Sequence, residues 1–149
     1  KTNSMRRLTV LGLILTFCSS AGCIFGDAAT SPTNYTIVSP VTETFQDTLE
    51  VKGSKAFSFT VGNPDPLRIT LASITSPSTG AAVTVNLKLS VGVWDAANTT
   101  CNGTFESTTS AALVAQYLQV APAGAYCVVV ADPGTLTTPV NFAVRIIHS

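Results

Sequence analysis

The sequence of 149 residues predicts an all-β protein, with an antiparallel, jelly-roll-like β-sandwich over residues 41–149. Several segments alternate between apolar and polar residues, which is the period of a half-buried strand. Turns rich in Gly, Pro, Asn and Asp separate these segments at short intervals, and no segment sustains a helical period over a long run. Abundant Thr, Ser and Val suit sheets whose outer faces are wetted by hydroxyl groups.

The first predicted strands lie in the N-terminal half of this region. Residues 41–51 offer one or two short strands, and residues 56–61 alternate, with Phe and Val on one face. Residues 62–66 predict a turn, because proline fixes φ while Asn and Asp tolerate turn geometry. Residues 67–74 alternate again, and residues 76–80 predict the next loop.

Residues 83–93 have the most regular pattern in the chain. Every odd position is Val or Leu and every even one is polar or Gly, so the whole run is predicted to be one half-buried strand. Gly92 is a candidate site for a bend in so long a strand. Lys88 on the wet face discourages edge-to-edge pairing.

The remaining predicted strands carry weaker signals. Residues 112–120 fit a strand or a helical turn, and their β-rich surroundings favour a strand. The other predicted elements are a polar loop at 95–103, a weak strand at 104–106, turns at 122–124 and 132–134, and strands at 126–130 and 140–147.

Residues 1–22 have the layout of a secretory signal peptide. Met5, Arg6 and Arg7 form a cationic start, and the apolar run at 8–17 is far shorter than the roughly 20 residues of a membrane-spanning helix. Residues 1–4 precede the expected start and are left out of the fold prediction.

The stretch from Ser20 to Cys23 resembles the bacterial lipobox, in which the cysteine is acylated and becomes the new N-terminus. Ser20 departs from the aliphatic residue usual there, and cleavage after Ala21 by ordinary signal peptidase is the alternative. The number of cysteines favours acylation of Cys23 over ordinary cleavage after Ala21. Cys18 leaves with the leader, and an acylated Cys23 leaves Cys101 and Cys127 as an even pair.

An exported domain with one cysteine pair is expected to form a disulfide, here between Cys101 and Cys127. In the strand at 126–130, Cys127 is expected on the outer face, with Tyr126, Val128 and Val130 facing inward. The bond would close a loop of 25 intervening residues and stabilise the fold by about 3 kcal/mol.

Residues 23–40 are expected to be a lipid-anchored linker in front of the domain. The protein is thus expected to be exported and membrane-anchored, a lipoprotein of a bacterial cell envelope. Ile24 replaces the Asp that signals inner-membrane retention in many Gram-negative lipoproteins, so the outer membrane is favoured. Three of the eight Lys and Arg residues lie in the leader, which leaves five against eight acidic residues. The body therefore lacks the basic patch that nucleic-acid binding requires.

Three stretches together resemble the bacterial pre-peptidase C-terminal (PPC) domain, a jelly-roll-like β-sandwich. They are residues 56–71, resembling its opening strand pair, residues 87–95, resembling its central strand that ends in an aromatic residue and Asp, and residues 122–130 with 141–144, resembling its Gly-x-Tyr hairpin and final strand. The resemblance covers roughly residues 47–147. It departs in the turn after Asp95, where the family often has glycine, and in the added cysteine pair.

The resemblance implies a non-catalytic module, since such domains are usually appendages of secreted hydrolases and some bind polymers. We therefore expect a lipid-anchored envelope domain that binds protein or polysaccharide or serves as a structural module. The alternatives are an accessory domain that assists a secreted hydrolase on another chain, and a small enzyme. Catalysis has little support, because His148, the single histidine, lies one residue from the end of the sequence, where a chain is expected to fray.

Two kinds of candidate ligand-binding residue remain. Asp65, Asp95, Glu106 and Asp132 lie in or near predicted turns, where carboxylates could converge on calcium; solvated turn acids are the alternative reading. No cofactor is otherwise expected, and a single histidine does not suit zinc. Trp94 is expected on the outer face, where it would either stack on a ligand or cover the loop leading to Cys101.

Overall fold

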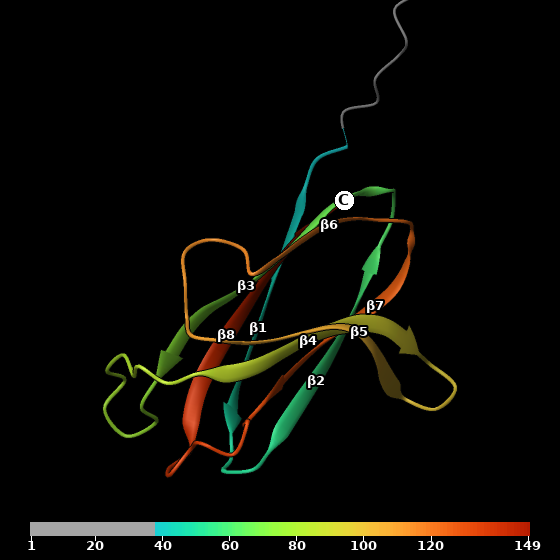
Figure 1. The fold of residues 1–149 in the computed structure, drawn as a ribbon. Helices are drawn as coiled ribbons and strands as arrows, with labels where there is room; N and C mark the ends of the chain where they lie inside the picture. The colour runs from blue at the N-terminus through green and yellow to red at the C-terminus, as the bar shows by residue number, and fades with distance from the viewer. Residues whose placement is uncertain (1–37) are drawn as a thin grey trace, which may run out of the picture. The chain divides into compact units, whose positions relative to one another are not determined.

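The structure, a computed structural model, describes residues 38–149, which fold into two antiparallel four-stranded sheets (Figure 1). The strands are β1 (Val41–Leu49), β2 (Ser54–Val61), β3 (Asp65–Thr75), β4 (Leu87–Asp95), β5 (Thr100–Thr109), β6 (Tyr117–Ala121), β7 (Gly124–Ala131) and β8 (Val140–His148). Within residues 38–149 there is no helix, and so none that could cross a membrane.

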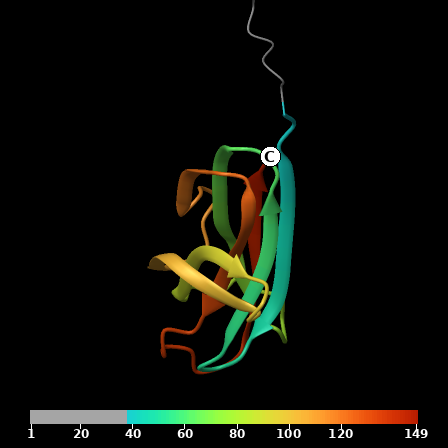
Figure 2. The same ribbon diagram turned by 90° about the vertical axis from the view of Figure 1, so that its right-hand side faces the viewer.

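The strand order confirms the predicted fold class. Sheet A has the order β1-β8-β3-β6 and sheet B the order β2-β7-β4-β5. The antiparallel pairs β1–β8, β2–β7, β3–β6 and β4–β5 make the chain one long two-stranded ribbon, whose tip is the β4–β5 hairpin. Successive pairs of this ribbon lie alternately in sheets A and B, which is the arrangement of a jelly roll. Figure 2 shows the start of β1 beside the end of β8, where Val41 pairs with His148.

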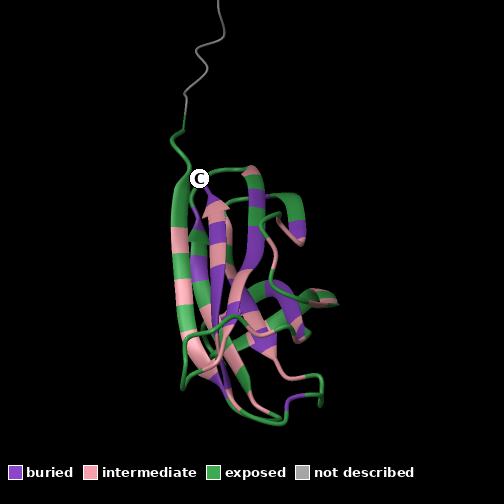
Figure 3. Ribbon diagram, turned by 90° about the vertical axis from the view of Figure 1, so that its left-hand side faces the viewer, coloured by how far each residue is buried: buried purple, intermediate pink, exposed green. Residues whose placement is uncertain are grey.

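The core lies between the inner faces of the two sheets. Buried and exposed residues alternate along the strands, as the banding in Figure 3 shows. The fully buried side chains include Leu67, Ile69 and Leu71 of β3 and Leu87, Leu89 and Val91 of β4. These are the inward positions that the alternating pattern predicted, so hydrophobic burial on one side of each strand explains their register.

Aromatic pairs join the two sheets at both open edges of the sandwich. Phe45 of β1 stacks on Phe57 of β2, with ring centroids 5.0 Å apart. At the opposite edge, Phe105 of β5 meets Tyr117 of β6 edge to face at 5.1 Å. Such contacts add to the free energy of area burial. They hold together strands that belong to different sheets and share no backbone hydrogen bonds.

Several predicted element boundaries are wrong. The long strand predicted at 83–93 begins at Leu87; before it, Ala82 forms an isolated bridge with Thr75, and Val83 and Val85 pack on the core outside any strand. The weak strand at 104–106 is in fact the ten-residue β5. Alternation reports one-sided burial, which a loop can also have, whereas an edge strand with polar residues on both faces shows little apolar period.

The ambiguous segment at 112–120 is part loop and part strand. Residues 117–121 form β6, while Leu113 and Val114 lie in the loop before it and are exposed. The single strand β1 replaces the one or two strands predicted at 41–51.

His148 does not lie on a fraying chain end, so that prediction is wrong. It is the last residue of β8 and 3% exposed. Its Nε2 lies 2.8 Å from Oε1 of Glu43 on β1, its Nδ1 lies 3.2 Å from the backbone oxygen of Ser149, and its ring centroid is 5.7 Å from that of Phe59. Ser149 is held in turn, since its backbone oxygen accepts the N–H of Gly62. The contacts of the histidine are structural ones.

The β4–β5 hairpin loop contains a strained residue. Asp95 Oδ1 accepts the backbone N–H groups of Ala97 and Asn98, and its Oδ2 accepts the Asn98 side-chain amide. These donors, the Asn98 side chain first, hold the pKa of Asp95 below its usual value. The next residue, Thr99, adopts φ 52°, a left-handed conformation that a β-branched residue rarely takes.

Replacing Thr99 by Gly is expected to raise the free energy of unfolding by about 1 kcal/mol, because glycine takes the left-handed conformation without a Cβ clash. Urea unfolding of the two chains measures the difference. Thr99→Ala is the control, since it keeps the Cβ and should gain little. Equal stabilisation by Gly and Ala would show that the gain does not come from φ.

Candidate functional site

The four candidate calcium ligands are not brought together. Asp65 begins β3, Asp95 ends β4, Glu106 lies within β5 and Asp132 follows β7. Within residues 38–149, no group of three or more His, Cys, Asp or Glu side chains is placed to hold a metal ion. Glu106 is instead 2.7 Å from Lys88 Nζ, its neighbour on β4. Each acid therefore has a separate local environment.

Asp132 organises the two loops at one end of the sandwich. Its Oδ1 accepts the backbone N–H groups of Gly134, Thr135 and Leu136, and its Oδ2 accepts that of Lys52 in the β1–β2 turn. Desolvation raises the pKa of this carboxyl, but the four N–H donors together outweigh it, and the pKa lies below its usual value. Both oxygens already have donors, so the geometry favours a structural role over cation binding.

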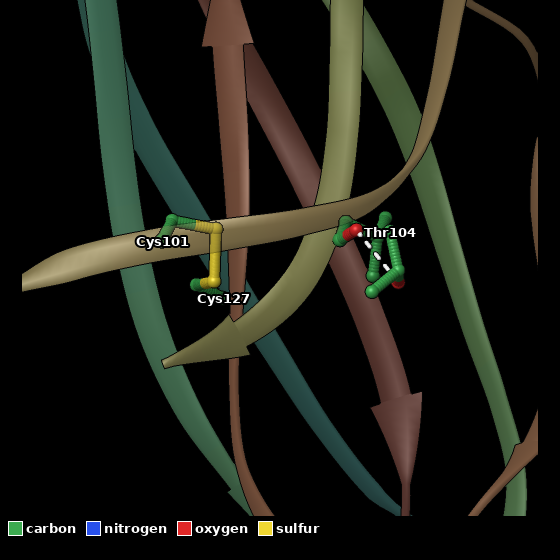
Figure 4. The surroundings of a disulfide bond; sticks show 4 residues. Cys101, Thr104 and Cys127 are labelled. Atoms are coloured by element: carbon green, nitrogen blue, oxygen red, sulfur yellow. Dashed lines mark hydrogen bonds between the residues drawn. A yellow bond between two sulfur atoms is a disulfide. The ribbon is translucent and has the colours of Figure 1, made fainter. Parts of the chain in front are cut away.

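The predicted disulfide between Cys101 and Cys127 is present, with Cα atoms 5.7 Å apart. It joins β5 to β7, which are not neighbours, because β4 lies between them in sheet B. Cys127 pairs with Gly92 of β4, and Cys101 pairs with Trp94. The bond therefore links β5 to β7 on the outer side of sheet B, beside β4 (Figure 4).

Gly92 makes this link possible. A Cβ built on it would lie 2.0 Å from the carbonyl oxygen of Asn102 and 2.7 Å from the Cα of Gly103, both backbone atoms of β5. A β-bulge between Val91 and Gly92 shifts the register, and the hydroxyl of Thr104 donates to the Val91 carbonyl at 3.3 Å (Figure 4). Sheet B therefore curls, so that β5 lies over β4. The curl is at Gly92, the residue predicted as a candidate site for a bend. Cys127, on the outer face, becomes fully buried.

Trp94 lies on the outer face of sheet B, as its parity in the strand predicts. It is half-buried and is the cross-strand partner of Cys101, so the indole and the disulfide share one face. This placement fits a side chain that covers the disulfide. The cavities described below do not include Trp94 among their lining residues.

A polar hollow lies on the outer face of sheet A. Two rows of cross-strand neighbours on β1, β8 and β3 form it: Gln46–Ala143–Ser73, and Thr48–Asn141–Thr75. The floor is low because the central residue of the first row is an alanine, and a bulge between Leu71 and Ser73 widens β3 beside it. The hollow has a volume of about 380 Å³.

The side chains around this hollow are amides and hydroxyls. Thr48 Oγ1 donates to Asn141 Oδ1 at 2.7 Å, and both residues line the hollow. Asp47 at the rim is 2.9 Å from Lys55 of β2, and hydrogen bonding to that lysine lowers the pKa of the carboxyl. The lining is therefore polar and close to neutral.

A second hollow of about 440 Å³ adjoins the first and shares Thr48 with it. Its other lining residues are Glu50, Ser76, Pro77, Ser78, Thr138 and Pro139. The two adjoining hollows, hereafter together the sheet-A groove, extend from the outer face of sheet A onto the loops at its end. We take it as the candidate functional site.

Sequence reasoning missed the sheet-A groove. Residues 41–51 and 140–147 were predicted as strands, but no sequence signal indicated that β1 and β3 both flank β8 and bring Gln46, Thr48 and Asn141 together. Cys23, the expected signal peptide and residues 23–37 of the expected linker lie outside the described residues.

No protein-family model and no curated protein sequence matches the chain. The resemblance to the PPC domain therefore stays a prediction, and the functional argument rests on the groove and the fold.

Proposed function

We propose that this domain is a non-catalytic binding module of the cell envelope that holds a neutral polysaccharide in the sheet-A groove. The observation that carries the proposal is the lining of the first hollow of the groove, where amide and hydroxyl side chains surround a low alanine floor. Sugars present hydroxyl groups that both donate and accept, and Asn, Gln, Ser and Thr side chains match that chemistry. An open groove also accommodates a chain, whereas a closed pocket would suit a small molecule.

We propose a binding role and not a catalytic one because of the contacts within the groove. Thr48 donates to an amide oxygen, which is no base, and the groove-lining residues include no histidine. His148 is buried on the inner side of sheet A against Glu43. Hydroxyl activation needs an adjacent base. The hydroxyls of Thr48, Ser76 and Ser78 bond to Asn141 or to each other rather than to Asp47 or Glu50, the two lining carboxylates, so the lining suits binding.

The proposal includes a lipid anchor on Cys23. The disulfide uses Cys101 and Cys127, the two cysteines of the described domain, so Cys23 has no partner among them. An acylated Cys23 would hold the groove at the membrane surface, within reach of envelope polysaccharides. Binding of the polymer by a tethered domain would gain from the high local concentration.

Replacing Ala143 by Gln is expected to abolish polysaccharide binding, because the longer side chain rises from the floor between Gln46 and Ser73. Binding is measured on an array of immobilised neutral polysaccharides. Asn141→Ala should weaken binding by about tenfold, the loss expected for roughly one hydrogen bond. The matched control is Ala56→Gln, the same substitution at an exposed position of β2 in sheet B, which should bind as wild type.

Retention of binding by Ala143→Gln would contradict the groove as the site. If Trp94→Ala lost binding in the same experiment, the ligand surface would lie beside the disulfide instead. Failure of the wild-type chain to bind any neutral polysaccharide would overturn the proposal itself.

A further inference from the structure

The edge strand β6 lacks the protection that the other sheet edges have. β1, β2, β5 and β6 end the two sheets. β1 carries Glu43 and Asp47, β2 carries Lys55 and β5 carries Glu106, whereas β6 (Tyr-Leu-Gln-Val-Ala) has no charged residue. Charged residues on an edge strand discourage pairing with another chain. Moreover, no charged residue occurs anywhere in residues 107–131.

Exposed apolar side chains gather at this same edge. The four most exposed large hydrophobic residues of the described chain are Leu113 at 92%, Val114 at 73%, Val120 at 72% and Leu118 at 60%. Leu118 and Val120 lie on β6, and the other two lie in the loop directly before it. A cluster of this kind on an uncharged edge marks an interaction surface.

The β3–β6 register fixes which groups of β6 face its free edge. Val120 pairs with Pro66, and Leu118 with Arg68. Because proline has no N–H, the Pro66–Val120 pair is a non-hydrogen-bonded one, and the alternation of antiparallel ladders makes Leu67–Gln119 a hydrogen-bonded pair. The backbone N–H and C=O groups of Leu118 and Val120 therefore point away from β3. Their side chains stand on the outer face, opposite the buried Tyr117 and Ala121.

We propose that this edge binds a second copy of the same chain, with β6 pairing antiparallel to β6 of that copy about a two-fold axis at Gln119. In this register Leu118 lies opposite Val120 of the second copy, and Val120 opposite its Leu118. The four outward-directed N–H groups, two from each copy, find carbonyl acceptors across the axis. The two four-stranded A sheets become one continuous eight-stranded sheet.

Self-complementarity is the argument for a second copy over a foreign strand. Two identical strands running antiparallel are related by a two-fold axis, so a short pattern of apolar, polar and apolar residues centred on Gln119 matches itself. Apolar side chains meet apolar ones, and the uncharged run at 107–131 brings no like charges together. The pairing is independent of the sheet-A groove, whose residues lie on β1, β8 and β3.

Sedimentation velocity of the full chain over a concentration series tests the pairing. The wild-type chain is expected to double its mass as the concentration rises. Val120→Lys should stay monomeric throughout, because each lysine would lie opposite an apolar side chain beside the axis. The matched control Val93→Lys changes a valine that is 51% exposed on β4, away from any sheet edge, and should dimerise as wild type.

Cross-linking tests the register. In a full chain with Cys18→Ser and Cys23→Ser, Gln119→Cys should form a covalent dimer under mild oxidation, since directly opposed residues of a non-hydrogen-bonded pair have Cα atoms about 4.5 Å apart. Leu118→Cys should cross-link far less, because its counterpart lies diagonally across the axis, roughly 8 Å away. A monomeric wild type, a dimeric Val120→Lys chain, or faster cross-linking through residue 118 would each overturn the proposal.

Discussion

The double substitution Cys101→Ala and Cys127→Ala is expected to lower the free energy of unfolding by about 3 kcal/mol. The bond closes a loop with a sequence separation of 26, and its removal returns the closure entropy of that loop to the unfolded chain. Cys127 is fully buried, so truncation also loses packing contacts. With a urea m-value of about 1.5 kcal/mol/M, the unfolding midpoint should fall by about 2 M.

The control for this comparison is Ser58→Ala. Ser58 is the exposed β2 neighbour of Cys127, and its substitution should change stability by less than about 0.5 kcal/mol. Unfolding of all chains under identical oxidising conditions measures the combined loss of the covalent link and of the Cys127 packing. A fall of less than about 1 kcal/mol for the double variant would mean that sheet B keeps its curl without the bond, and that the loop entropy is already restricted in the unfolded chain.

The sequence could predict this disulfide, but not why the two cysteines can meet. Counting cysteines and placing Cys127 on the outer face indicated the pair. The two cysteines lie on strands that are not neighbours, because β4 separates β5 from β7. The close approach depends on the missing Cβ of Gly92 and on the bulge beside it, and both become interpretable once the β4–β5 register is known.

Local patterns predicted the fold class and most strands for a physical reason. One face of β3 and one face of β4 are buried, at positions that include Leu67, Ile69, Leu87 and Leu89. Alternate residues of a strand share a face, so this burial produces an alternation of apolar and polar residues in the sequence. The error at β5 has the same origin, since an edge strand with polar residues on both faces carries no such period. Val83 and Val85 alternate and pack on the core outside any strand, and alternation alone does not distinguish such a segment from a strand.

The sheet-A groove and the fate of His148 could not be predicted because both depend on long-range pairing. Asn141 meets Thr48 across 93 positions, and His148 meets Glu43 across 105. The jelly-roll ribbon pairs the start of the domain with its end, so residues near the end of the sequence become central in sheet A. A histidine judged by its distance from the end of the sequence was therefore misassigned.

Replacing Gly92 by Ala is expected to cost about 3 kcal/mol or more in the free energy of unfolding. The added Cβ would lie 2.0 Å from the Asn102 carbonyl oxygen, and backbone atoms cannot rotate aside as a flexible side chain would. The matched control is Gly103→Ala in the paired position of β5, where a Cβ would come no closer than 3.9 Å, to Ser90 Cβ. That change should be tolerated within about 1 kcal/mol.

The two large effects are expected to be coupled, because the disulfide holds β5 down over β4. In the Cys101→Ala, Cys127→Ala chain, β5 can withdraw from Gly92, and Gly92→Ala should then cost less by at least about 1 kcal/mol. Urea unfolding of the four chains of this cycle measures the coupling. If Gly92→Ala lowers the free energy of unfolding equally with and without the disulfide, the close approach of β5 to Gly92 is due to the β4–β5 ladder and the Thr104–Val91 hydrogen bond. A reduced cost would assign it to the disulfide, which would then act by stabilising the curl of sheet B as well as by shortening the unfolded chain.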